Sequence, residues 1–348
     1  MHMADALVSP AVGGTMWVVS AGAIGYCSSR IKKNLDDGTV SLMGVLGAFV
    51  FAAQMINFAI PATGSSGHLG GGLLLAVLLG PAAAFLTLAS ILVVQALFFA
   101  DGGILALGCN IFNMGFIPCL IAYPLFYKPL VRTECTSPRI VIASLVAAIA
   151  GLQLGSLGVV FQTIFSGITD LSPQTFLFFM QPVHLAIGIV EGLATASIIL
   201  FIARARPDIL HFSVHTASFR KKPLRKPLLL FFSAALILGS IMSLLASGLP
   251  DGLEWSLLHS AGMAETPGPP GSVHEALAGV QEKTALLPDY EFRQHAGTPS
   301  AGDNQFSPVL PGGASGTSFS GFIGSILTLL IVSLIGLLLK RRQTHTGS

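Results

Sequence analysis

Long apolar segments, separated by short polar stretches, recur along the whole chain. A run of about 18 or more apolar residues is typical of a helix that crosses a lipid bilayer. The pattern therefore predicts an all-α, polytopic membrane protein built as a helical bundle. The predicted segments are 11–28, 40–60, 70–82, 83–100, 104–127, 140–165, 175–203, 227–249 and 319–339.

The stretch 70–100 decides how many times the chain is expected to cross the membrane. As a single helix it would be about 45 Å long, against a hydrocarbon core of about 30 Å. Because proline disrupts a helix interior, Gly80-Pro81 predicts a break there. The short piece 70–82 is then expected to be a re-entrant or shielded helix, which is tolerated only inside protein.

Basic residues test this count, because Lys and Arg of membrane proteins concentrate on the cytoplasmic side. All but two of the 18 Lys and Arg residues fall in four clusters, within 30–33, 128–139, 204–226 and 340–342. Nine spans with an outside amino terminus place all four clusters inside. The same count places the loop between the second and third segments outside, on the face that carries the amino terminus.

The basic stretch divides the chain into two predicted units. We expect a seven-span unit at 1–205, a basic cytoplasmic linker at 206–226 and a two-span unit at 227–348. The last unit contains a polar outside loop, 250–318, rich in Gly, Pro, Ser and acidic residues. Within the second segment, Gly44, Ala48 and Ala52 form a stripe of small residues that permits close helix contact. The stripe predicts either packing within this chain or docking of another membrane subunit.

Composition supports a membrane protein and argues against several other classes. Hydrophobic residues make up 52% of the chain and charged residues only 10%, with a mean hydropathy of +0.76. A net charge of +2 gives no reason to expect nucleic acid as a partner. The chain has no phosphate-binding G-x-x-x-x-G-K-[ST] motif and no H-E-x-x-H motif in a span, so we expect neither ATP hydrolysis nor intramembrane metalloprotease activity.

The amino terminus carries a candidate metal chelator. No Lys or Arg precedes the first apolar run, so we expect no signal peptide and a mature terminus at Met1. The Met1 amine, the His2 amide nitrogen and the His2 imidazole can then bind one metal ion together. Metals that prefer square-planar nitrogen, Ni(II) and Cu(II), favour the necessary loss of the amide proton. The alternative is an ordinary terminal histidine.

The loop Ile60-Pro61-Ala62-Thr63-Gly64-Ser65-Ser66-Gly67-His68-Leu69-Gly70-Gly71-Gly72 supplies one further strong ligand, His68. Since this loop is predicted to share the outer face with His2, two imidazoles and an amine can converge there. The alternative is a loop histidine exposed to water. Polar residues at membrane depth, among them Gln54 on the second segment, predict either helix-to-helix hydrogen bonds or a shell that orients these ligands. The candidates for this shell are Asn57, Thr63, Ser65, Ser66, Asn110, Asn113, His184 and Glu191.

Four motifs in order resemble the NikM/CbiM family of substrate-capture components of energy-coupling-factor (ECF) transporters for nickel and cobalt. They are the opening Met-His, IPATGSSGHLGGG at 60–72, GCNIFNMGF at 108–116 and HLAIGIVEGLATA at 184–196. The resemblance covers about residues 1–205. PDGLEW at 250–255 and LLPDY at 286–290 make the second unit resemble the NikN/CbiN accessory component, so the whole resembles a fused NikMN protein.

The resemblance implies a metal site of four nitrogens, namely the Met1 amine, the His2 amide, the His2 imidazole and the His68 imidazole. Met3 and Ala6 depart from the family pattern, which has Ile and Gly there, but neither position supplies a ligand. The loop sequence SSGHLGG differs from the SSSHPTG of cobalt members, which favours Ni(II) as the transported substrate over Co(II). Square-planar nitrogen coordination favours Ni(II) as well.

The resemblance also implies partners and a location. An ECF-type transmembrane coupling subunit and ATPase subunits would drive import, with membrane lipid around the bundle. The expected location is the bacterial or archaeal cell membrane, with the amino terminus extracytoplasmic and the carboxyl terminus cytoplasmic. Two alternatives remain open at this point: a cobalt importer component of the same family, and a metal facilitator that works without ATPases.

Overall fold

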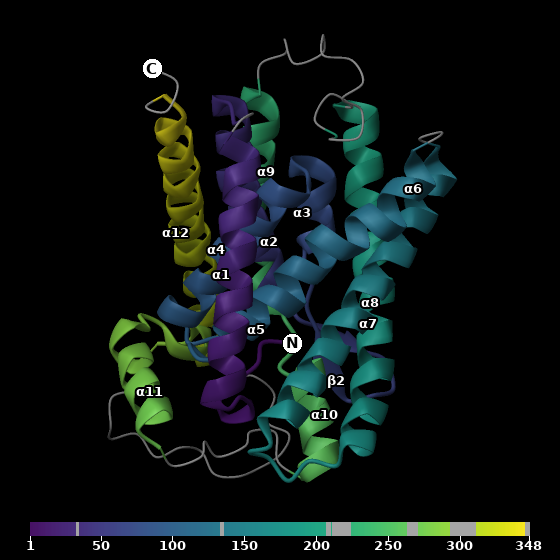
Figure 1. Ribbon diagram of the computed structural model, residues 1–348. Coiled ribbons are helices and arrows are strands. Elements are labelled where there is room, and N and C mark those ends of the chain that lie inside the picture. Colours follow the sequence, from purple (N-terminus) through teal and green to yellow (C-terminus); the bar gives the residue numbers. More distant parts are fainter. Residues whose placement is uncertain are drawn as a thin grey trace.

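A computed structural model describes residues 1–32, 35–132, 136–206, 210, 224–262, 271–292 and 311–344. The architecture is a helical bundle with one small antiparallel hairpin, as the hydrophobic pattern predicts (Figure 1). Most of the predicted linker 206–226, and the parts 263–270 and 293–310 of the predicted outside loop, lie outside the described residues.

The first unit contains the hairpin and the longer helices. Its helices are α1 (Pro10–Lys32), α2 (Asp37–Gln54), α3 (Gly72–Leu79), α4 (Pro81–Phe98), α5 (Leu107–Asn110), η2 (Ile111–Tyr127), α6 (Lys128–Val131), α7 (Ser137–Ser166) and α8 (Pro173–Ala205), after a short turn η1 (Asp5–Leu7). Its strands are β1 (Phe58–Ile60) and β2 (Ser65–Gly67), with Phe58 opposite Gly67. Helices α5, η2 and α6 form one continuous helix, of which η2 is a π-helix.

The second unit has two long helices and shorter elements between them. They are α9 (Arg225–Ser240), η6 (Met242–Leu245), α10 (Gly252–Ala261), α11 (Ser272–Thr284), η7 (Pro288–Tyr290) and α12 (Pro311–Thr344). Asp251 begins α10, because its side chain accepts hydrogen bonds from the backbone N–H of Leu253 and Glu254 while Glu254 reaches back to the Asp251 N–H. This capping box satisfies backbone donors that the first turn of a helix leaves without partners.

The break expected near Gly80-Pro81 is present. Helix α3 ends at Leu79 and α4 begins at Pro81, with Gly80 at φ 81° between them, a conformation that favours glycine. All eight residues of α3 are buried in protein. This short helix is therefore shielded from lipid, as the sequence predicts.

The expected count of seven plus two spans is not confirmed. Within the described residues, six helical stretches are long and apolar enough to cross a membrane: 37–54, 81–98, 107–131, 137–166, 173–205 and 316–341. Helix α3, with eight residues, is too short to span alone, and α9 has 16 before the chain turns into η6. Glycine and serine dilute the hydropathy of α1, which is 23 residues long. The short apolar segments indicated helices but did not fix their lengths.

The stripe of small residues on α2 is covered by the same chain. Helix α12 packs along α2, and the backbone of Gly44 lies against Ser333 and Leu329. Ala48 and Ala52 are fully buried. The structure thus shows packing within the chain at this stripe, with α12 against Gly44.

The amino terminus and the accessory elements α10 and α11 lie toward one end of the bundle, and α12 ends toward the other (Figure 1). Ser66 of β2 donates its backbone N–H to the Pro250 carbonyl at 2.7 Å, just before α10. The segment after α11 is anchored beside the end of α4, where the Leu286 N–H donates to the Phe98 carbonyl at 2.8 Å. Elements of the second unit (residues 227–348, called the accessory unit below) therefore contact the end of the bundle that holds the amino terminus.

Candidate metal site

The first residues of the chain are drawn into the bundle by Asn110. The Met3 N–H donates to Asn110 Oδ1 at 2.8 Å, and Asn110 Nδ2 donates to the Met3 carbonyl at 3.1 Å. The Gly103 N–H also donates to the Met3 carbonyl, at 2.9 Å. Met3 is fully buried as a result. Because these hydrogen bonds fix Met3, Met1 and His2 lie within two residues of a position that is held in the bundle.

The structure brings His2 and His68 together. Their rings are stacked, with centroids 5.3 Å apart and an angle of 22° between the planes. His68 follows β2, whose hairpin turn contains Ala62 at φ 63° and Gly64 at φ 74°. His68 Nδ1 lies 3.2 Å from the Leu69 carbonyl, which can only accept, so Nε2 is the nitrogen left for a ligand. Burial, reinforced by the Met1 amine, lowers the pKa of His68 to about 4, which keeps the imidazole neutral.

His2 has a polar partner on each ring nitrogen. Its Nε2 lies 3.2 Å from Gln95 Oε1, and its Nδ1 lies 3.2 Å from Asp101 Oδ1. Burial lowers the pKa of His2, although the Asp101 carboxylate opposes that effect. Asp101 is held in turn by the accessory unit, because the Tyr290 hydroxyl donates to Asp101 Oδ2 at 2.5 Å.

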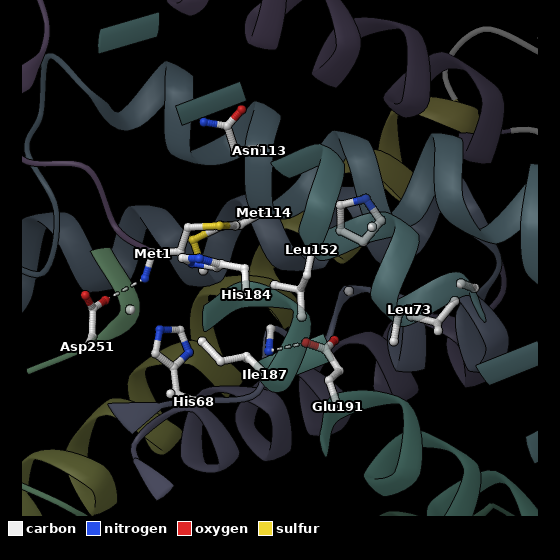
Figure 2. A pocket seen from close by; sticks show the side chains of 18 residues that line it. Met1, His68, Leu73, Asn113, Met114, Leu152, His184, Ile187, Glu191 and Asp251 are labelled. Atoms are coloured by element: carbon white, nitrogen blue, oxygen red, sulfur yellow. Dashed lines mark hydrogen bonds and ion pairs between the residues drawn. The ribbon is translucent and has the colours of Figure 1, made fainter. Parts of the chain in front are cut away.

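The Met1 amine is paired with a carboxylate of the accessory unit. Asp251 Oδ2 accepts from the amine at 2.6 Å, while Asp251 Oδ1 caps α10 (Figure 2). Burial alone would raise the pKa of Asp251, but the charge and hydrogen bond of the amine hold that pKa well below its usual range. The pair joins residues 250 positions apart in sequence.

Two polar residues of α8 lie at the edge of the same site. Glu191 accepts the backbone N–H of Gly70 at 2.9 Å and of Gly71 at 3.0 Å, which fixes the loop just after His68. His184 Nδ1 bonds to the Met180 carbonyl at 2.8 Å, and its buried Nε2 has no hydrogen-bond partner among the described residues. A cavity of about 30 Å³, lined in part by Met1, His68, His184, Glu191 and Asp251, connects them (Figure 2).

Of the other predicted shell residues, Asn113 also lines this cavity, whereas Asn57, Thr63, Ser65 and Ser66 are not part of its lining. Thr63 and Ser65 share a hydrogen bond of 2.7 Å inside the hairpin turn, and the Ser66 hydroxyl donates to the Leu249 carbonyl at 2.7 Å. Asn113 pairs with Gln162, and the Asn57 carbonyl accepts from the Ser247 N–H at 2.8 Å. These residues shape the hairpin, the bundle and the contact with the accessory unit rather than contacting His2 or His68.

Sequence reasoning missed several residues that the structure places at the site. Gln95, Asp101, Asp251 and Tyr290 contact Met1, His2 or each other. A signal was present for two of them, because Asp251 and Tyr290 belong to the motifs PDGLEW and LLPDY. Within the described ranges, no three His, Cys, Asp or Glu side chains come together to hold a metal ion.

Comparison with known proteins assigns the chain to a protein family. Residues 2–209 match the family described as the cobalt uptake substrate-specific transmembrane region, and residues 225–341 match the PDGLE domain. The chain belongs to the CbiM family. It is accordingly a substrate-specific membrane component of transition-metal uptake with a PDGLE domain, and it is not an enzyme.

Named relatives match the chain over different lengths. The fused nickel transport protein NikMN of Rhodobacter capsulatus is 29% identical over 314 residues, which cover 83% of this chain and 88% of that protein. A putative metal transport protein of Haloquadratum walsbyi is 37% identical over 210 residues, which cover 60% of this chain and 93% of that protein. A solved structure described as a truncated transition metal transporter aligns with 28% identity and a TM-score of 0.52, over 59% of this chain and 99% of its own.

Proposed function

We propose that this CbiM-family protein captures Ni(II) through four nitrogens: the free Met1 amine, the His2 amide, His2 Nδ1 and His68 Nε2. The observation that carries the proposal is the convergence of Met1, His2 and His68 from two distant segments into one buried site. With metal–nitrogen bonds of about 2 Å, two imidazoles on one ion have ring centres roughly 4.5–6 Å apart. The measured separation of 5.3 Å falls in that range.

The chemistry of the site supports a metal that accepts planar nitrogen. Burial lowers the pKa of both imidazoles, which favours the neutral form that can bind a metal ion. The amine pairs with Asp251 and His2 Nδ1 faces Asp101, so an arriving cation takes over two nitrogens that now face carboxylates. Nickel suits this nitrogen set better than cobalt. Relatives are named for nickel transport and for cobalt transport, and Co(II) is the second candidate ion.

The proposal extends to the setting of the site. We place the site on the extracytoplasmic face of a bacterial or archaeal cell membrane, because the basic clusters then lie inside. Import would require a transmembrane coupling subunit and ATPase subunits of the ECF type, since the chain has no phosphate-binding loop. Residues 1–205 would form the capture unit, and 227–348 an accessory unit that contacts the metal site.

Titration of the purified, full-length protein with Ni(II) and with Co(II) tests the proposal. A yellow, diamagnetic Ni(II) complex is expected, with Ni(II) bound more tightly than Co(II). His2→Ala and His68→Ala should each abolish high-affinity binding, and so should one residue added before Met1, since the amine becomes an amide. His259→Ala is the matched control, because this exposed histidine of α10 lies outside the site. Normal binding by either alanine variant, or by the extended protein, would refute the ligand set.

A further inference from the structure

An apolar groove lies between α8 and α9, at a depth where the membrane surrounds the bundle. Helix α9 packs against α2 and α12, whereas α8 packs against α7. The space between α8 and α9 has a volume of about 540 Å³, and α2 and the start of α3 line its inner side. Its lining on α8 comes from residues 190–198, in the middle of a stretch that is long and apolar enough to cross a membrane.

The groove exists because small residues line it where larger side chains would fill the space. Ala194 of α8 and Ala234 of α9 line it from two different helices. Ala53 of α2 and Gly71, just before α3, line it from the inside. Protein interiors leave few voids larger than a water molecule, so a groove of this volume is expected to be occupied.

The groove opens toward the bilayer and offers little to water. Val190 and Ile237 line it and are exposed at the protein surface. Among the described lining residues, only Glu191 and Thr195 carry polar side chains, and the Glu191 carboxylate already accepts two backbone N–H groups. An ordered water molecule needs two to four polar partners, so the lining favours an apolar occupant from the membrane.

The size of the groove distinguishes between two apolar occupants, a lipid chain and a helix of a partner protein. A methylene group takes up about the volume of a water molecule in the liquid, about 30 Å³, so 540 Å³ corresponds to a chain of roughly 18 carbon atoms. An α-helix about 10 Å across fills about 420 Å³ per turn, so the groove would hold little more than one turn. The acyl chain of a lipid therefore fits, and a spanning helix does not.

We propose that one acyl chain of a membrane lipid binds in the groove between α8 and α9, more firmly than the lipids around the rest of the bundle. Leu69 and Gly71 bring the loop that carries His68 to the groove, and Glu191 lines both the groove and the cavity at the candidate metal site. The acyl chain thus packs on the membrane side of that loop. The inference does not depend on the proposed metal ligands, because none of them lines the groove.

Photo-cross-linking of the purified, full-length protein in lipid vesicles tests the proposal. The vesicles contain phosphatidylethanolamine and phosphatidylglycerol, with a small fraction carrying a diazirine on one acyl chain, and mass spectrometry locates the labelled residues. Label should concentrate on 190–198 of α8 and 234–238 of α9, above the lipid-exposed face of α7 within 142–165. An enrichment of about fivefold is expected for a site that binds lipid about 1 kcal/mol more tightly than its surroundings.

Two substitutions fill the groove from opposite helices. In Ala194→Trp the label on 234–238 should fall to the level found on α7, and in Ala234→Trp the label on 190–198 should fall in the same way. Ala21→Trp is the matched control, because it adds the same side chain at an exposed position of α1 outside the groove, and it should leave the labelling unchanged.

The wild-type distribution decides the matter even if a tryptophan variant fails to fold. Even labelling of α7, α8 and α9 in the wild type would overturn the proposal, and so would unchanged labelling in both folded tryptophan variants. Groove labelling that disappears at a high ratio of protein to lipid, together with cross-links between two copies of the chain, would assign the groove to a second copy and would also overturn the proposal.

Discussion

The tether on Met3 gives the sharpest quantitative prediction, through the change Asn110→Leu. Leucine has a similar size but offers neither donor nor acceptor. The Met3 carbonyl would keep its bond from the Gly103 N–H, whereas the fully buried Met3 N–H would lose its partner. An unsatisfied buried N–H costs about 1–3 kcal/mol. Since ordering of residues 1–3 precedes chelation, Ni(II) affinity should fall roughly five- to 150-fold.

Isothermal titration with Ni(II) measures this loss, and digestion of the metal-free protein by an aminopeptidase provides an independent readout. Digestion should accelerate in Asn110→Leu, because Met1 and His2 spend more time outside the bundle. Gln153→Met, which alters a glutamine away from the amino terminus, should leave both measurements at wild-type values. Wild-type affinity and digestion rate in Asn110→Leu would show that other contacts, and not this asparagine, order the amino terminus.

Two other substitutions test separately the ion pair at the candidate site and the packing of α2 against α12. Asp251→Asn keeps a good helix cap but loses the ion pair with the Met1 amine, so it should destabilise the metal-free protein more than the Ni(II)-bound protein. The increase in thermal midpoint that Ni(II) causes should therefore be larger in this variant than in the wild type. An equal or smaller increase would contradict this reasoning. Gly44→Leu should destabilise the protein by about 1–3 kcal/mol, because its side chain would collide with Ser333 and Leu329. Gly22→Leu, whose position is open, is the control in denaturant unfolding, and equal stability of the two variants would refute the packing argument.

Local sequence patterns predicted much of the fold. The apolar runs indicated the helices, and the break between α3 and α4 followed from Gly80-Pro81, because the physical cause lies in two adjacent residues. The lengths of helices were less predictable. Helix α3 stops after eight residues and is stabilised by burial on all sides, which depends on neighbours distant in sequence. The hairpin before His68 also escaped prediction, since its strands have only three residues each.

The candidate site also contains some residues that the sequence predicts and others that it does not. Met1, His2 and His68 were predicted because their chemistry is visible in the sequence, and charge placement put them on one face. The groups that pair with them could not be predicted. The partners Met1–Asp251 and Asp101–Tyr290 are 250 and 189 positions apart, and nothing local specifies which carboxylate meets which donor. The contact of Gln95 with His2 was equally unpredictable, because the two residues are 93 positions apart.

The two carboxylates at the candidate site link the CbiM-family region to the PDGLE domain. Asp251 comes from the accessory unit and faces the Met1 amine, and Tyr290 of the same unit holds Asp101 against His2. Met1 and His2 therefore both meet groups that the accessory unit supplies or positions. Fusion keeps these groups at a high effective concentration without a separate binding step. Loss of the accessory contacts would free the amine and His2 Nδ1 together, so the metal site and the accessory unit form one structural unit at this end of the bundle.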